Sequence, residues 1–229
     1  ESGTTDTYEI ALQTAPTATV EITVTADAQS EVSVDGVTFG STAVFSRTDT
    51  TAQTVTIRAI DDSTQEGNHS STITHAITNT GDATNYPTSM VIDSVTVTVA
   101  DNDVPGVTLT QTDGGTSVSE DGATDTYSIA LDSIPAGTVQ ITVTSDAQSE
   151  VSSDGVNFGS NAVFNFNDTS TQNVTIRAID DSAEEGNHTS TISHSVTSTA
   201  DSTNYPLTFS IDDLTVIITY FCQVGIIYD

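Results

Sequence analysis

The sequence has almost no positive charge. Three arginines and no lysine stand against 32 Asp and Glu in 229 residues, which gives a formal net charge of −29. A surface of this kind repels nucleic acid and anionic lipid and attracts cations, so nucleic-acid binding is excluded. The absence of lysine also excludes Schiff-base chemistry, a phosphate-binding P-loop and Lys–Asn isopeptide bonds.

Cysteine and long apolar runs are equally scarce. The one cysteine, Cys222, cannot form an internal disulfide, and we expect it to be a buried apolar residue. No run of 18 apolar residues predicts a membrane-spanning helix, so no membrane insertion is expected, and the first residues lack the basic and apolar regions of a signal peptide. Threonine is abundant instead, which favours β-strands with one wet face.

An internal repeat organises the chain. Sliding the sequence by 119 residues aligns Glu1–Val99 with Glu120–Ile218 without a gap, and 63 of the 99 positions are identical. Two copies of one module therefore follow each other. The first copy lacks the counterpart of residues 106–119, so it begins inside a domain, and we expect the chain to be a piece of something longer.

Within each copy, apolar residues alternate with threonine or other polar residues, as in Thr138–Thr144. This period of two predicts antiparallel strands with one buried face. Copy two contains about seven such segments, near residues 107–119, 126–131, 138–145, 161–166, 172–179, 190–198 and 207–219. The predicted fold is all-β: two tandem seven-stranded Greek-key, immunoglobulin-like β-sandwiches, the first without its first strand. The predicted domains are residues 1–105 and 106–229, the second ending in an apolar tail, 220–229.

Carboxylates gather where these strands end. Asp180-Asp181 follow one strand, Asp146 follows another, Glu120 precedes a third, and Asp101-Asn102-Asp103 close copy one. Antiparallel order brings these segments to one pole of the sandwich. Crowded carboxylates repel, and a hard cation such as Ca²⁺, with six to eight oxygen ligands, removes that repulsion.

Four segments carry a resemblance to the Calx-β domain family: Val118-Ser119-Glu120, Ser153-Asp154-Gly155, Ile179-Asp180-Asp181 with Glu184 and Glu185, and Asp101-Asn102-Asp103. The resemblance implies a sandwich that binds Ca²⁺ at one pole. By the same resemblance, site one would use Glu1, Asp27, Asp61, Asp62, Glu66, Asp101 and Asp103. Site two would use Glu120, Asp146, Asp180, Asp181 and Glu185, with Glu184 as a further candidate. The middle-loop ligand is either Asp27 or Asp35 in copy one, and either Asp146 or Asp154 in copy two.

Other candidate sites are weaker. His69 and His75, repeated as His188 and His194, are six residues apart, which is no zinc-ligand motif, so we interpret them as packing or surface histidines. No Gly-x-Ser-x-Gly elbow is present, and no catalytic residues are expected. The four Asn-x-Ser/Thr sequons are compatible with chance in a threonine-rich chain. Asn85-Tyr86-Pro87 and Asn204-Tyr205-Pro206 are expected to pin strand entries.

These patterns predict a non-enzymatic, calcium-stabilised structural module of an extracellular surface, adhesive or filament-forming protein. A calcium-sensing regulatory domain and an accessory module of a secreted hydrolase are the alternatives. The expected partners are neighbouring copies or adjacent repeats, joined head-to-tail. As a hypothesis, the tail 220–229 of one chain supplies the strand that copy one of the next chain lacks.

Overall fold

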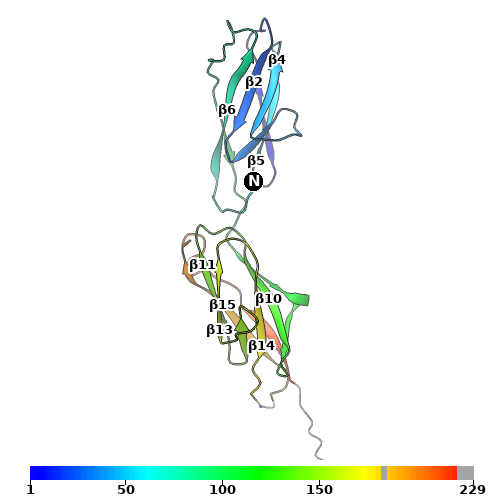
Figure 1. The fold of residues 1–229 in the computed structure, drawn as a ribbon, viewed down its shortest axis with the longest axis vertical. Helices are drawn as coiled ribbons and strands as arrows, with labels where there is room; N and C mark the ends of the chain where they lie inside the picture. The colour runs from blue at the N-terminus through cyan, green and yellow to red at the C-terminus, as the bar shows by residue number, and fades with distance from the viewer. Residues whose placement is uncertain (182–184, 221–229) are drawn as a thin grey trace, which may run out of the picture. The chain divides into compact units, whose positions relative to one another are not determined.

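The computed structural model describes residues 1–181 and 185–220. The chain divides into two compact units: one holds Glu1–Asp62 and Glu66–Asn102, and the other holds Ser63–Gln65 and the chain from Asp103 onward. Figure 1 shows that each unit is built from strands, so the predicted all-β class is confirmed. Among the described residues, no helix has the length and apolar character needed to cross a membrane.

The first unit contains seven strands among its described residues. They are β1 (Thr5–Ile10), β2 (Val20–Ala26), β3 (Ser30–Ser33), β4 (Thr42–Arg47), β5 (Gln53–Ala59), β6 (His69–Thr80) and β7 (Val95–Val99). One sheet has the order β1-β5-β3 and the other the order β4-β2-β6-β7. All of these pairs are antiparallel.

The second unit repeats this arrangement and adds two strands at its start. Its strands are β8 (Val107–Gln111), β9 (Thr116–Ser119), β10 (Thr124–Leu131), β11 (Val139–Ser145), β12 (Ser149–Ser152), β13 (Asn161–Phe166), β14 (Gln172–Ala178), β15 (His188–Thr199) and β16 (Leu214–Thr219). The sheet orders are β12-β14-β10-β8 and β13-β11-β15-β16-β9. Only the β9–β16 pair, among those the structure describes, is parallel.

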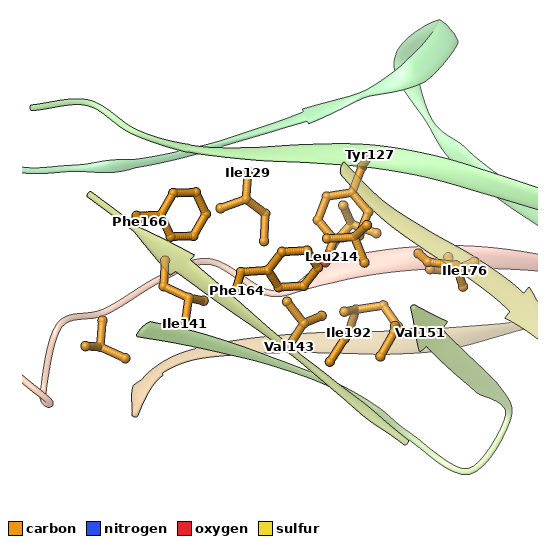
Figure 2. Close-up of a cluster of buried hydrophobic side chains, with 14 of the residues drawn as sticks. Tyr127, Ile129, Ile141, Val143, Val151, Phe164, Phe166, Ile176, Ile192 and Leu214 are labelled. Carbon is orange, nitrogen blue, oxygen red and sulfur yellow. The ribbon is translucent and has the colours of Figure 1, made fainter. Parts of the chain in front are cut away.

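The core of each unit follows from the alternation in the sequence. In β11, Val139, Ile141 and Val143 are fully buried while the residues between them face outward. Figure 2 shows Ile141 and Val143 pointing at residues of the facing sheet, among them Ile129. Each fully buried Val or Ile contributes roughly 1.5–3 kcal/mol, so these alternating strands stabilise the sandwich mainly through one face.

In both copies, the tyrosine of the Asn-Tyr-Pro loop forms hydrogen bonds to a second loop. Tyr205 is fully buried, and its hydroxyl donates to the Ser133 carbonyl at 3.0 Å and accepts from the Ser133 amide at 3.2 Å. Tyr86 makes the same pair of bonds to Thr14. This geometry agrees with the structural role expected for both loops.

Copy one has no counterpart of β8 and β9 among the described residues, and this leaves an open edge on each of its two sheets. In copy two, β10 lies between β14 and β8, and β16 lies between β15 and β9. Their counterparts β1 and β7 each have a neighbour on one side only, among the described residues. Tyr127 and Ile129 of β10 are at most 1% exposed, whereas the equivalent Tyr8 and Ile10 are only half-buried.

The strand boundaries differ from the prediction in three places. The segment 107–119 is not one strand, because the turn Thr112–Gly114 separates β8 from β9. The four-residue strands β3 and β12 were not predicted, since each offers only one apolar residue, Val32 or Val151, to the pattern. The last strand of copy two begins at Leu214, not at residue 207. Cys222 and the tail after Tyr220 lie outside the described residues.

Candidate metal centre

The acidic pole of copy one is built around the loop that follows β5. Asp101, just after β7, accepts hydrogen bonds at its Oδ2 from the amides of Glu66 (2.8 Å) and Gly67 (2.6 Å). Gly67 has a φ of 70°, a left-handed conformation that glycine adopts without strain. This clamp turns the loop so that Glu66 and His69 come to face the end of β7.

Glu1 brings a buried carboxyl group to this pole. Its side chain is 1% exposed, and its backbone nitrogen donates to the Ala100 carbonyl at 2.6 Å. Burial raises the pKa of Glu1, and the nearby charge of Asp101 raises it further, against the opposing effect of its amino group. Asp62 raises the pKa and His69 lowers it by smaller amounts. Its Oε2 atom is buried and has no hydrogen-bond partner.

His69 faces two of these carboxylates through one ring nitrogen. Its Nδ1 lies 2.9 Å from the Gly67 carbonyl, which can only accept, so Nδ1 carries the proton. The other nitrogen, Nε2, is buried without a hydrogen-bond partner, 3.8 Å from Glu1 Oε1 and 3.6 Å from Glu66 Oε2. One ligand atom from each of Glu1, Glu66 and His69 lies within 4.8 Å of the others, and Glu1 and Asp101 are within the same distance.

Copy two repeats this cluster with one change. Glu120, Glu185 and His188 offer ligand atoms within 4.8 Å of one another. His188 Nδ1 lies 2.9 Å from the Gly186 carbonyl, and its Nε2 is buried without a hydrogen-bond partner, 3.6 Å from Glu185 Oε2. Where copy one has Asp101, copy two has Tyr220, whose amide donates to Asn187 Oδ1 at 3.1 Å. The second cluster therefore keeps its histidine and two glutamates without that aspartate.

The carboxylates of Asp27 and Asp146 accept hydrogen bonds from backbone amides and a serine hydroxyl. Asp27 accepts from Ser71 Oγ (2.7 Å), the Thr72 amide (2.6 Å) and the Gln29 amide (3.1 Å). Although burial acts to raise the pKa of Asp27, these hydrogen bonds outweigh it and hold the pKa below its ordinary value. Asp146 makes the equivalent bonds. Both oxygens of each carboxylate are already engaged, which indicates a loop-fastening role.

The alternative middle-loop residues are likewise engaged. Asp35 accepts from the amides of Thr38 and Val37 and from Ser33 Oγ, and these bonds hold its pKa far below the usual range. Asp154 closes the same turn in copy two. These bonds are those of an Asx turn, which explains the Asp-Gly pair in the sequence.

Among the described residues, the remaining predicted ligands lie outside the two groups that contain a histidine. Asp61, Asp62, Asp180 and Asp181 are exposed residues that follow β5 and β14, and of these only Asp62 is near enough to raise the pKa of Glu1. Asp103 is the first residue of the second unit's main segment, so its ligand role remains a prediction. Glu184 lies outside the described residues.

The four histidines, interpreted alike from the sequence, lie in two different surroundings. His75 and His194 do pack, because their Nε2 atoms bond to the hydroxyls of Tyr8 (2.6 Å) and Tyr127 (2.7 Å). His69 and His188 instead belong to the acidic clusters. The pattern that could have revealed them is Glu-Gly-Asn-His, which stands at 66–69 and again at 185–188 and places a glutamate three residues before a histidine.

Comparison with known proteins shows only a weak similarity of fold. No family model and no curated protein matches the chain. Similar solved structures include CBD12 from CALX1.2, with a TM-score of 0.37 and 12% identity over 94% of this chain and 93% of that one. The calcium binding domain CBD12 of CALX1.1 follows at 0.35 and 13%, over 95% and 93%. The D0-D1 domain of intimin has a TM-score of 0.30 and 13% identity, over 96% and 91%. These values describe a weak resemblance, so the site's own residues carry the functional argument.

Proposed function

We propose that this chain is a calcium-stabilised structural module of an extracellular surface, adhesive or filament-forming protein. The observation that supports the proposal is the buried carboxyl group of Glu1, crowded by Asp101 and Asp62 and without a hydrogen-bond partner at Oε2. A buried charge in this position destabilises the fold unless a cation neutralises it. Ca²⁺ suits the site because it takes six to eight oxygen ligands in flexible geometry.

The proposed ligands of copy one are Glu1, Asp62, Glu66 and Asp101, completed by water or backbone oxygens. Copy two would use Glu120 and Glu185 with Asp180 and Asp181. Two of the three arginines are already paired with other carboxylates. Arg58 pairs with Glu31 at 2.7 Å and Arg177 with Glu150 at 2.6 Å, so both guanidinium groups are already engaged with carboxylates other than Glu1 and Glu120.

The proposal predicts a calcium-dependent melting temperature that depends on Glu1. Extracellular modules bind calcium with Kd of roughly 10⁻⁴–10⁻³ M, and a hundredfold excess over Kd stabilises the folded state by about 2.7 kcal/mol. Glu1→Gln removes both the ligand and the buried charge. The variant should melt higher than wild type in EDTA and gain less from calcium, measured by scanning calorimetry across a calcium titration.

Glu9→Gln is the matched control, because Glu9 is an exposed carboxylate on β1 outside the cluster. It should leave the calcium response unchanged. A wild-type protein that melts at the same temperature in EDTA and in excess calcium would overturn the proposal.

We also propose that copy one accepts a β-strand from another module of the same kind, joined head-to-tail. Copy two provides the template, since β8 and β9 occupy the places beside β10 and β16. In copy one a groove of about 440 Å³ lies at the equivalent place, lined by Tyr8 of β1, Ile57 of β5 and the strand Val95–Val99. An unpaired sheet edge of this kind recruits a strand from another chain.

Asp6 supports this strand-acceptor role. Its counterpart Asp125 accepts from the Ser117 amide at 2.8 Å and from Thr112 Oγ1 at 2.9 Å, which fastens the start of β9 to β10. Asp6 accepts only from the Thr7 amide among the hydrogen bonds of the described residues. An incoming segment with the pattern of residues 107–119 would supply the missing donors.

A further inference from the structure

We propose that Glu1, Glu66 and His69, and again Glu120, Glu185 and His188, each bind a transition-metal ion of the Zn²⁺ type. This inference goes beyond the proposed calcium function and does not depend on it, because it assigns an imidazole nitrogen to the metal. Calcium prefers oxygen ligands, whereas imidazole suits zinc, copper and nickel.

The first argument is the direction of the histidine lone pair. In each copy Nδ1 donates to the backbone carbonyl of a glycine two residues earlier, so the neutral ring presents an unprotonated Nε2 to the carboxylates. Metal-binding histidines usually donate their second ring N–H to a carbonyl or carboxylate, which fixes the tautomer and orients the ring. Gly67 and Gly186 have left-handed φ values of 70° and 68°, so both copies build this turn in the same way.

The second argument is the spacing of the ligand atoms. A charged histidine bonded directly to a carboxylate would place nitrogen and oxygen about 2.7–2.9 Å apart. The observed separations are 3.6 Å to Glu66, 3.8 Å to Glu1 and 3.6 Å between His188 and Glu185. Two ligands of a tetrahedral zinc ion, each about 2.0–2.2 Å from the metal, lie about 3.3–3.5 Å from one another. In copy one His69 Nε2 therefore lies near the spacing that a shared ion requires from both carboxylates. In copy two His188 Nε2 does so from Glu185, whereas Glu120 lies within 4.8 Å.

The third argument is that the cluster contains buried polar atoms with no partner. Glu1 Oε2, His69 Nε2 and His188 Nε2 are all buried without a hydrogen bond. The Glu1 side chain is only 1% exposed, and its carboxylate belongs to the same group of converging ligand atoms. Buried polar atoms are normally satisfied, so these three point to an absent ligand.

The fourth argument is repetition. Copy two has lost the aspartate that corresponds to Asp101 but keeps the glutamate–glutamate–histidine group within 4.8 Å. Three protein ligands leave one position of a tetrahedral ion open for water or another ligand. Because Asp101 also lies within reach of Glu1, we expect copy one to bind the ion more tightly than copy two.

The test uses the full chain after removal of metals with a chelator. Isothermal titration with Zn²⁺ should give two ions per chain, His69→Gln and His188→Gln should each give one, and the double variant none. The calcium-dependent shift in melting temperature should persist in the histidine variants, since calcium would use the carboxylates. His75→Gln is the matched control, because it removes an imidazole that bonds to Tyr8 outside the cluster.

A second measurement needs no variant. Ring-nitrogen NMR of the wild-type chain should show Zn²⁺ shifting Nε2 of His69 and His188, while His75 and His194 stay unchanged. Zinc binding with unshifted His69 and His188 resonances, or no zinc binding, would overturn the inference. Zinc binding without any calcium response would sustain this inference and sink the proposed calcium function.

Discussion

At the scale of single residues, aspartates do the work of fastening loops to distant parts of each sandwich. Asp201 is 4% exposed and accepts from the Ala136 amide at 2.9 Å and from the Asn204 amide at 3.1 Å. Burial acts to raise the pKa of Asp201, but these hydrogen bonds outweigh it, so the pKa lies below the ordinary value. The bonds hold the loop that carries Tyr205, and Asp82 does the same beside Tyr86.

Asp201→Asn should therefore destabilise copy two in a pH-dependent way. A folded-state pKa below the unfolded value of about 3.9 stabilises the fold above that pH, and this contribution is lost as the pH falls through the folded pKa. We expect a loss of about 2 kcal/mol at pH 7, the value of a hydrogen bond to a charged group, shrinking below about pH 4. Denaturant unfolding at several pH values measures it.

Asp113→Asn is the control for this comparison, because Asp113 is exposed and its side chain makes no hydrogen bond among those described. It should follow wild type at every pH. An Asp201→Asn deficit as large at pH 2 as at pH 7 would show that the charge plays no part.

At the scale of strands, the most consequential feature is the pair of open edges on copy one. A synthetic peptide of residues 106–119 should bind there, because it contains the segments that form β8 and β9. In copy two, Leu109 lies opposite Ile129, so the peptide's leucine would lie opposite Ile10. Hydrogen exchange of the full chain should slow at the amides of β1 and β7 when the peptide is added.

Two comparisons make the peptide experiment specific. A peptide with Val107→Asp and Leu109→Asp should not protect these amides, since both side chains pack against the core of copy two. Asp6→Asn in the chain should weaken binding of the unaltered peptide. Protection by a peptide of residues 220–229, but not by 106–119, would instead favour the tail as the donor.

The strands themselves could be predicted because their cause is local. Alternation of Val and Ile with threonine needs no knowledge of the partner strand, so β11 and its repeat β2 follow directly from the sequence. The four-residue β12 could not be found in this way, since its pairing with β14 depends on the preceding turn. The break between β8 and β9 also depends on tertiary structure, because β9 pairs with β16, about 100 residues away.

The candidate metal centre could be predicted only in part for the same reason. Antiparallel order alone brings Glu1, Glu66 and Asp101 to one pole, and the structure places them there. The sequence does not show whether a carboxylate at this pole already accepts hydrogen bonds from other residues. Asp27 is occupied by donors from Ser71 and Thr72, residues about 45 positions away, which no local pattern reveals.

At the scale of the whole molecule, the charge balance leads us to expect that cations from solution stabilise the fold. Two of the three arginines are committed to ion pairs and also stack on rings, Arg58 on Phe39 at 4.2 Å and Arg177 on Phe158 at 4.4 Å. With a net charge of −29, most carboxylates have no protein cation to pair with. Net charge of one sign destabilises a compact state by self-repulsion, which bound divalent ions would offset locally.

The two modules should also differ in stability, although they share most of their sequence. Where copy two buries Tyr127, Ile129, Leu214 and Val216, copy one leaves the equivalent Tyr8, Ile10, Val95 and Val97 half-buried beside its open edges. Since full burial of such a side chain is worth roughly 1.5–3 kcal/mol, copy one should unfold first. Calorimetry in EDTA should therefore show two transitions.

A matched pair of core substitutions assigns these transitions. Ile73 of β6 and Ile192 of β15 are equivalent, fully buried positions in the two cores. Replacing a buried isoleucine by alanine costs about 2–5 kcal/mol, and for a domain of this size each kcal/mol lowers the melting temperature by about 4–8 °C. Ile73→Ala should lower only the first transition, by roughly 10 °C or more, and Ile192→Ala only the second. A single transition that moves with either substitution would show that the two modules unfold as one cooperative unit, against this prediction.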